Sequence, residues 1–312
     1  MRAMTIIPLF LVLAIMVGVG LWLWTPDKSR ADLEARYLQS PDDLIEVAGI
    51  RLHVRDSGSR EAPPKAPVVI LIHGFGSSLH TWESWARELS VDHRVISLDL
   101  PGSGLSDPDP TGDYTVGRDV EIVRAVMDAM GIDRASLIGQ SMGGRIAWNL
   151  AARDPGRVEK LVLIAPDGFA APGVEYGRKA EVPLPMRLMR YALPRVLLRM
   201  NLEPAFADPA KMTDAYVTRY HDLMLAPGAR DALIARMEQD TREDPVPLLR
   251  LIQAPTLLLW GTKDAMIPIA NAADYLGALP NAKLVRLDGI GHVPQEEAPA
   301  AALEPIKAFL KP

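Results

Sequence analysis

A short apolar run near the start of the chain limits the folds it can adopt. Residues 68–76, "VVILIHGFG", are almost continuously apolar, rich in β-branched side chains and closed by glycine. A strand with water on one face would alternate apolar and polar residues, whereas a strand buried on both faces does not. The run therefore predicts a central strand of a parallel sheet, with both faces of the sheet covered by helices.

The rest of the chain repeats this pattern. A hairpin of two strands is expected over residues 44–58, turning at Gly49. Further strands are predicted at 94–98, 135–139, 159–165, 256–260 and 283–287, and helices at 81–89, 116–130, from 142, at 269–278 and from about 297. Strands separated by helical stretches form βαβ units, so the fold class is α/β, with a mostly parallel sheet and helices on both faces.

The alternation is interrupted once, by residues 167–247, which are predicted to be a helical cap inserted into a core of residues 44–166 and 248–312. Within it, residues 177–200 carry six basic side chains against the single acid Glu181, and Pro194 should break the helical pattern. Two interpretations stay open. Either the apolar face covers the core and the arginines are solvated, or the segment is a basic amphipathic surface that lies on anionic lipid.

The amino-terminal segment differs from the globular remainder. No charged residue occurs between Arg2 and Asp27, and residues 6–24 are almost wholly apolar. About 20 such residues cross a hydrocarbon core of roughly 30 Å, so residues 1–26 are predicted to be a single transmembrane anchor and 27–43 a stalk. A cleaved signal peptide is the alternative. Basic residues flank both ends and leave the orientation open; we expect a bacterial inner membrane, with the periplasmic side preferred for the domain.

Composition excludes several classes of function. The net charge of −5, with no long basic block, argues against nucleic-acid binding, and the absence of cysteine excludes thiolate chemistry and thiolate metal sites. "GSGLSD" at 102–107 begins like a dinucleotide-binding fingerprint but ends in Asp107. Neither a metal nor an organic cofactor is therefore expected.

The segment Gly139-Gln140-Ser141-Met142-Gly143 is a G-x-S-x-G motif between a predicted strand and a predicted helix. In such a nucleophile elbow the serine occupies a strained turn that exposes its hydroxyl at the edge of the sheet. The flanking glycines are needed because side chains there would collide with neighbouring backbone. Ser141 is therefore the predicted nucleophile.

A serine hydroxyl needs a base, and the base needs an orienting acid. Of the six histidines, His292 lies in a glycine-flanked loop after the last strand, from which its ring can reach across the sheet edge. Asp264, four residues beyond an apolar strand, is the preferred acid, and Asp167 is the reserve. Asp99 is expected to stabilise its own Pro-Gly turn instead.

An oxyanion formed during acyl transfer needs donors that already point toward it. The backbone N–H of Met142, directly after the nucleophile, and the N–H of Phe75 in "HGFG" are the candidates. His73 is interpreted as a structural residue that braces this loop.

In this order, "LIHGFGSS", "DLPGSGLSD", "GQSMGGRIAW", "WGTKDAMIP" and "GHVPQEE" resemble the α/β-hydrolase superfamily over about residues 44–311. The chain is most similar to capped bacterial lipolytic enzymes and carboxylesterases, and also to hydrolases that cleave carbon-carbon bonds in ring-cleavage products. The resemblance implies Ser141 as nucleophile, His292 as base, Asp264 as acid, and Phe75 and Met142 as oxyanion donors. One departure is Gln140, where His or Asn is commoner. Relatives with an aspartate nucleophile are disfavoured by Ser141.

The sequence thus predicts a membrane-tethered serine hydrolase that cleaves a hydrophobic carboxylic ester through an acyl-enzyme, with a small molecule as substrate. Cleavage of a carbon-carbon bond by the same residues is the nearest alternative. A non-enzymatic ligand receptor or scaffold on the same fold is an alternative of a different class.

Overall fold

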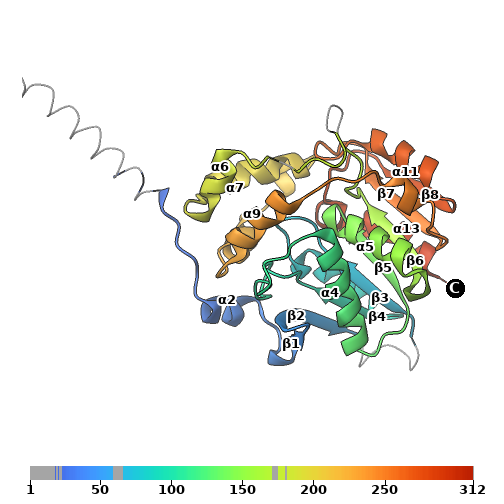
Figure 1. Ribbon diagram of the computed structural model, residues 1–312, viewed down its shortest axis with the longest axis horizontal. Coiled ribbons are helices and arrows are strands. Elements are labelled where there is room, and N and C mark those ends of the chain that lie inside the picture. Colours follow the sequence, from blue (N-terminus) through green and yellow to red (C-terminus); the bar gives the residue numbers. More distant parts are fainter. Residues whose placement is uncertain are drawn as a thin grey trace, which may run out of the picture.

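A mostly parallel eight-stranded sheet forms the centre of the protein (Figure 1). The computed structural model describes residues 18, 20, 23–58, 66–170, 175–179 and 181–311. The strands lie in the order β1-β2-β4-β3-β5-β6-β7-β8, and only the pairings of β2 with β1 and β4 are antiparallel. Their bounds are Leu44–Val47, Ile50–Ser57, Val68–Ile72, Arg94–Leu98, Ala135–Gln140, Val158–Ile164, Thr256–Gly261 and Ala282–Leu287. The predicted α/β fold is confirmed.

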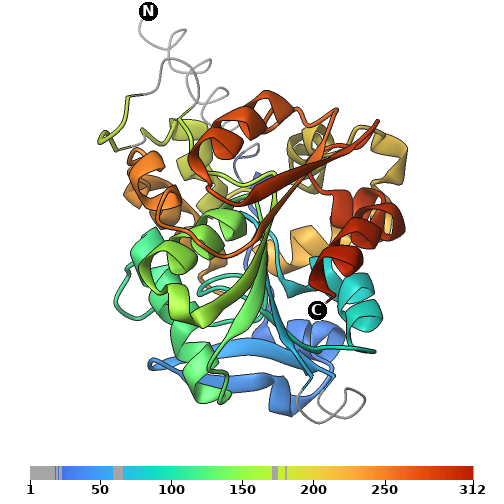
Figure 2. The same cartoon turned by 90° about the vertical axis from the view of Figure 1, so that its right-hand side faces the viewer.

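Helices cover both faces of this sheet (Figure 2). In the described part of the chain, the α-helices that flank the β6–β7 connection include α2 (Arg30–Tyr37), α3 (Glu83–Leu89), α4 (Val116–Ala129), α5 (Met142–Arg153), α11 (Ala272–Ala278), α12 (Pro294–Glu297) and α13 (Pro299–Leu310). Along β3, Ile70 and Ile72 join the core under α4 and α5, while Val69 and Leu71 join the core under α3 and α13. All four side chains are fully buried, which explains why the strand has no polar alternation.

The connection between β6 and β7 is helical. It contains α6 (Leu184–Arg187), α7 (Arg195–Leu202), α8 (Asp214–Met224), α9 (Ala229–Gln239) and α10 (Val246–Leu249), together with short 3₁₀ turns. Helix α7 begins directly after Pro194, whose ring is compatible with the start of a helix but not with its interior. Leu233 and Ala232 of α9 face Gly76 and Gly102, which follow β3 and β4. This helical segment, here called the cap, therefore lies over the carboxyl edge of the sheet.

Residues 27–43, expected to be a stalk, lie against the cap. Leu33 of α2 is buried beside Leu223 and Ala226. Asp222 of α8, itself buried, accepts hydrogen bonds from three groups of this segment: Lys28 Nζ at 2.6 Å, Arg36 Nη1 at 2.8 Å and the Tyr37 hydroxyl at 2.9 Å. The chain that precedes the core is thus attached to the cap by a charged centre.

The predicted anchor of residues 1–26 falls mostly outside the described residues. Among the residues that are described, no helix combines the length and the apolar character needed to cross a bilayer.

Candidate active site

Ser141 occupies a strained turn between β5 and α5. Its φ of 54° and ψ of −119° lie in a region that residues with a side chain rarely adopt. Two backbone hydrogen bonds maintain the turn: Ser141 N–H donates to the Ile164 carbonyl at 2.9 Å, and Asp167 N–H donates to the Ser141 carbonyl at 3.0 Å. The neighbouring strand β6 and the residues after it therefore hold the serine in a conformation that it would not choose alone.

The two glycines of the motif are required by close backbone approach. A Cβ atom at Gly139 would overlap the carbonyl group of Gly143, and one at Gly143 would overlap the carbonyls of Ile72 and His73. Backbone cannot move aside as the end of a flexible side chain can. The turn is therefore closed to every residue except glycine at these two positions.

His292 and Asp264 form a buried pair at the same edge of the sheet. His292 Nδ1 lies 2.8 Å from Asp264 Oδ2, and because a carboxylate only accepts, Nδ1 carries the proton. The other oxygen, Asp264 Oδ1, accepts from the N–H groups of Met266 and Ile267 at 2.9 and 2.8 Å. The arrangement fixes the orientation of the ring and leaves Nε2 as the acceptor.

Gln140 links the nucleophile to the loop between β8 and α12 that carries His292. Its side-chain Nε2 donates to the His292 carbonyl at 3.1 Å, between residues 152 positions apart. Its Oε1 lies against Gly74, where a Cβ atom would overlap it. The sequence marked this residue only as a departure from the commoner His or Asn; its long glutamine side chain spans the gap between two loops.

The candidate oxyanion donors lie where the loop after β3 approaches Ser141. A Cβ atom at Gly74 would be 3.3 Å from Ser141 Cβ, so the two backbones are close. Met142 is the first residue of α5, and the N–H of a first helical residue has no partner within its helix. Phe75 is inside a turn closed by the hydrogen bond from Ser77 N–H to the Gly74 carbonyl at 3.2 Å. Both N–H groups thus belong to backbone that surrounds the nucleophile.

His73 braces the loop after β3 that carries Phe75, here called the oxyanion loop, rather than facing a substrate. Its Nε2 accepts from Leu100 N–H at 3.1 Å, so Nδ1 donates to the Gly74 carbonyl at 2.8 Å. Burial lowers the pKa of His73, which keeps the ring in the neutral form that this pattern requires.

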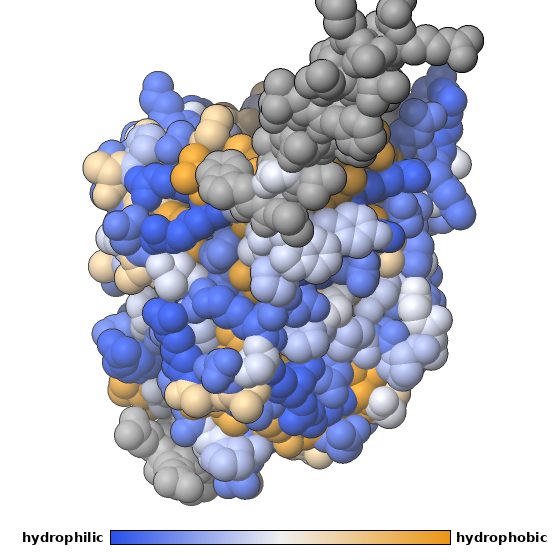
Figure 3. All heavy atoms as spheres, turned by 90° about the vertical axis from the view of Figure 1, so that its left-hand side faces the viewer, coloured by the Kyte–Doolittle hydropathy of each residue, from blue (hydrophilic) through white to orange (hydrophobic). Residues whose placement is uncertain are grey.

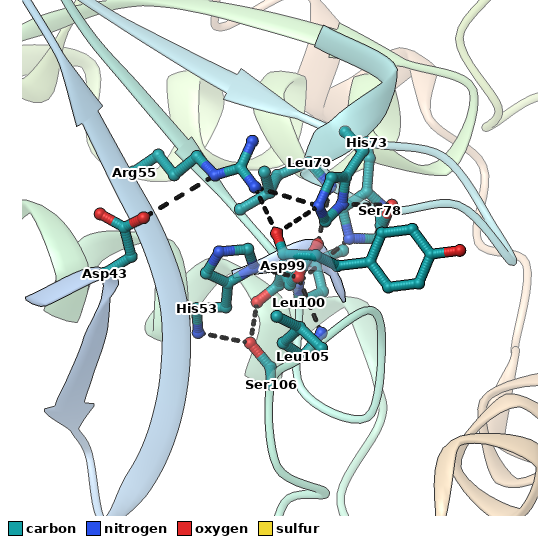
Figure 4. Close-up of polar contacts among 12 residues, drawn as sticks. Asp43, His53, Arg55, His73, Ser78, Leu79, Asp99, Leu100, Leu105 and Ser106 are labelled. Atoms are coloured by element: carbon teal, nitrogen blue, oxygen red, sulfur yellow. Dashed lines mark hydrogen bonds and ion pairs between the residues drawn. The ribbon is translucent and has the colours of Figure 1, made fainter. Parts of the chain in front are cut away.

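Asp99, at the end of β4, is the centre of a second buried network (Figure 4). Its carboxylate accepts from Leu79 N–H at 2.6 Å, from Leu105 N–H at 2.9 Å and from His53 Nδ1 at 2.7 Å. Burial alone would raise the pKa of Asp99, but the adjacent His53 imidazole holds it well below its usual range. Asp99 therefore stabilises the loops after β3 and β4, whereas the sequence suggested only its own Pro-Gly turn.

Asp167, the reserve acid, is engaged elsewhere. Its carboxylate lies 3.0 Å from Arg242 Nη1 and 3.7 Å from Arg145 Nη1. Arg145 also pairs with Asp240 at 2.6 Å. The two arginines and two aspartates connect α5 to the end of the cap, whereas Asp264 is the acid on His292.

The cap contacts both catalytic loops, which the sequence did not predict. The Tyr220 hydroxyl lies 3.0 Å from Ser77 Oγ and donates to Glu296 Oε1 at 3.4 Å, and Arg219 Nη2 donates to the same oxygen at 2.8 Å. Burial raises the pKa of Glu296, and Arg219 offsets part of this effect. The only sequence feature near this contact was the pair of acids in "PQEE", of which Glu296 lies four residues after His292.

An apolar contact also joins the cap to the chain next to His292. Phe206, Met212 and Val217 of the cap are buried against Val293. The His292 N–H donates to the Ala205 carbonyl at 2.8 Å. Beside the oxyanion loop there is a small cleft, bounded by Gly76, Ser77, Gly102, Tyr220, Leu223 and Leu233. Among the described residues, no group of three or more His, Asp or Glu is placed to hold a metal ion.

These features agree with the comparison to known proteins. Residues 67–299 match the family of the alpha/beta hydrolase fold, so the chain belongs to the α/β hydrolases. An uncharacterised protein of Mycobacterium tuberculosis is 30% identical over 279 residues, which is 85% of this chain and 79% of the relative.

Two further relatives represent two chemistries. The 2-hydroxy-6-oxo-6-phenylhexa-2,4-dienoate hydrolase of Burkholderia cepacia is 29% identical, over 80% of this chain and 88% of its own. The crystal structure of a bacterial membrane phospholipase A is similar with a TM-score of 0.70 and 29% identity, over 99% of this chain and 98% of its own. The family is that of hydrolases acting on small molecules; the bond cleaved differs among its members.

Proposed function

We propose that the protein is a serine hydrolase that cleaves carboxylic esters with a hydrophobic acyl group through an acyl-enzyme. The observation that carries the proposal is the buried His292–Asp264 pair, which Gln140 ties to the strained turn of Ser141. A nucleophile elbow beside an oriented imidazole is the arrangement that acyl transfer requires.

In the first half of the reaction, Ser141 Oγ attacks the ester carbonyl carbon while His292 Nε2 takes the hydroxyl proton. The N–H groups of Phe75 and Met142 donate to the oxyanion. The C–O bond to the alcohol then breaks, and His292 returns the proton to the leaving oxygen. The serine is left acylated.

In the second half, a water molecule gives its proton to His292 and attacks the acyl carbon. The bond to Ser141 Oγ breaks, the serine regains its proton from His292, and the free acid leaves. Asp264 holds the ring in place and stabilises the imidazolium that forms twice in the cycle.

The preference for an uncharged, hydrophobic ester is supported by what surrounds the site. Phe206, Met212 and Val217 of the cap pack against Val293, the residue after His292. The nearby guanidinium groups of Arg145 and Arg219 are committed to Asp240 and Glu296. A substrate that carries a carboxylate would have to compete with these ion pairs, whereas a neutral acyl chain would not.

Membrane attachment is part of the proposal. The apolar run of residues 6–24 is proposed to anchor the protein in a bacterial inner membrane, with the hydrolase domain on the periplasmic side. The likeness to a membrane phospholipase A over nearly the whole chain supports this. Protection of the domain from protease in right-side-out and inverted vesicles would test the orientation.

Cleavage of a carbon-carbon bond is the second candidate, supported by the likeness to the Burkholderia cepacia dienoate hydrolase. The name of that enzyme gives its substrate as a dienoate with a 6-oxo group, which is a keto acid rather than an ester. Purified protein should be given both substrate types, because the two reactions share the serine and histidine and only the products separate them.

The deciding experiment is hydrolysis of nitrophenyl esters of increasing chain length, with Ser141→Ala as the control. We expect rates that rise with chain length and are lost in the alanine variant. Equal rates in both proteins, or no ester cleavage at any length, would refute the ester assignment. A fluorophosphonate probe that fails to label Ser141 in folded protein would favour a non-enzymatic receptor.

A further inference from the structure

The outer side of the cap exposes an unusual number of apolar side chains. Half of the large apolar side chains that are exposed in the described part of the chain fall within residues 184–200. Six of these define what we call the cap apolar surface, each between 50 and 69% exposed: Leu184, Leu188, Tyr191, Val196, Leu197 and Met200. Figure 3 shows this face, with apolar residues lying among hydrophilic ones in its upper part. Exposed apolar clusters of this kind mark an interaction site.

The amino-terminal chain meets this same surface. The indole of Trp24, itself 56% exposed, stacks on the ring of Tyr191 with centroids 6.2 Å apart. Thr25 N–H donates to the Tyr191 carbonyl at 3.0 Å, and Leu193 N–H donates to Thr25 Oγ1 at 3.1 Å. The apolar run of residues 6–24 therefore ends on the cap apolar surface.

We infer that the cap apolar surface inserts into the interfacial layer of the bilayer that residues 6–24 enter. The inference rests on the proposed membrane anchor. An anchor that leaves the domain at Tyr191 brings the surrounding side chains to the same depth as Trp24, and an interfacial tryptophan marks the level of the headgroups. The occupant of the surface is thus a phospholipid monolayer.

Most arginines around this surface are paired with acidic side chains, and this pairing indicates which force would bind the surface to a membrane. Arg187 lies 3.6 Å from Glu238, Arg190 lies 3.5 Å from Asp231, and Arg195 lies 3.4 Å from Asp214. The excess of positive charge in the sequence is local to the segment, and acids from α8 and α9 oppose it in space. Docking should therefore depend on apolar insertion and only weakly on anionic lipid.

Docking also bears on the active site through α8. His221 Nε2 hydrogen-bonds the Leu193 carbonyl at 2.8 Å, next to the cap apolar surface. The adjacent Tyr220 reaches Ser77 of the oxyanion loop. A lipid-facing segment and a site-facing residue thus share one helix, which suits a substrate that is taken from the bilayer.

Depth-dependent quenching in proteoliposomes can test the inference. The chain has no cysteine, so a single introduced one can be labelled cleanly with an environment-sensitive dye. Leu197→Cys probes the surface, and Val91→Cys, 63% exposed in the loop before β4 at the opposite edge of the sheet, is the control. Full-length protein is used throughout.

We expect acyl-chain spin-labelled lipids to quench the dye at position 197 but not at position 91, equally in zwitterionic and anionic vesicles. Equal quenching at the two positions would overturn the inference. A dye at position 197 that is shielded from lipid, with disulfide-linked dimers of the unlabelled Leu197→Cys protein, would assign the surface to a second copy of the chain instead. Quenching seen only with anionic lipid would overturn the apolar mode.

An activity measurement adds an independent readout. Val196→Glu combined with Leu197→Glu should lower hydrolysis of a bilayer-embedded ester by about tenfold or more. The same variant should hydrolyse a water-soluble short-chain ester at the wild-type rate, and Val91→Glu should leave both unchanged. If the wild type cleaves neither ester, the proposed function fails while the quenching result still decides the docking.

Discussion

The carboxyl edge of the sheet and the cap above it are held in different ways. At the sheet edge, backbone lies against backbone: Gly143 fits between the nucleophile turn and the end of β3, where no side chain could enter. The cap makes backbone contacts too, among them the hydrogen bond from His292 N–H to the Ala205 carbonyl, but side chains also hold it. Three of its side-chain attachments are charged: Asp222 to the amino-terminal segment, Glu296 to α8 and Arg145 to the end of the cap.

The difference matters because the two kinds of contact respond differently to change. Backbone packing admits one geometry, so a substitution there either fits or fails. A charged attachment can open and close at a cost of a few kcal/mol, because water and counter-ions replace the partner. The sheet edge is therefore the fixed part of the site, and the cap is the adjustable part.

The largest effect should come from Asp264, the acid at the sheet edge. Asp264→Asn should lower kcat about 10⁴-fold with the fold intact, because an amide at this position favours the wrong tautomer of His292. Esterase kinetics and circular dichroism measure the two quantities. Asp167→Asn, which changes the acid on Arg242, is the matched control and should leave kcat nearly unchanged; the reverse ranking would exchange the two roles.

Packing at the elbow should give the next largest effect. Gly143→Ala places a methyl group against the carbonyls of Ile72 and His73 and should destabilise the protein by about 3 kcal/mol or more. The control is Gly277→Ala in α11, where no atom lies within 4 Å and the helix should gain up to about 1 kcal/mol. Thermal unfolding in detergent compares them, and similar melting temperatures would contradict the account of the turn.

The sequence predicted the sheet edge better than the attachments of the cap. Strand β3 was evident from its unbroken apolar run, and the turn of Ser141 from glycines two residues away on either side. Asp264 was preferred because it follows a strand end, and its hydrogen bond to His292 agrees with that choice. These features are local, so a short window of sequence contains them.

The attachments of the cap could not be predicted in this way. Asp222 pairs with Lys28, 194 residues away, and nothing near either residue signals the contact. The segment of residues 27–43 is polar enough to be a free stalk, and only the folded chain shows that Leu33 and the partners of Asp222 dock it. The balance of charge on the cap apolar surface was likewise hidden, since the opposing acids belong to later helices.

The charged attachment at Asp222 should be weaker than the elbow. Asp222→Asn removes the charge that faces Lys28 and Arg36 and should cost about 2 kcal/mol, because a buried hydrogen-bonded charge contributes on this scale. Asp214→Asn, at an 83% exposed side chain that also pairs with arginines, should change stability by less than about 0.5 kcal/mol. Melting temperatures and limited proteolysis at the cap report both; faster cleavage within the core would contradict the prediction.

The smallest effect is a dependence on pH where α2 meets the core. Burial lowers the pKa of His80 from 6.5 to about 4. The unfolded chain therefore binds a proton between these values that the folded protein does not, and stability falls as the pH is lowered from about 6.5 toward 4. Between pH 7 and 5.5 the loss should be about 1 kcal/mol.

The variant His80→Gln isolates this contribution. Its stability should decline less steeply over the same interval, by about half a proton on average in the slope of unfolding free energy against pH. Parallel curves for the two proteins would show that folding does not lower the pKa of His80.

Gln140 has a consequence for thermal motion. Its side-chain amide contacts both the loop that carries the base and the loop that carries an oxyanion donor, and Gln140 itself directly precedes the nucleophile. A fluctuation that displaces either loop is therefore transmitted to the other, and the three parts drift together rather than apart. The distances among the nucleophile, the base and the oxyanion donor should therefore vary less than the position of any one of them.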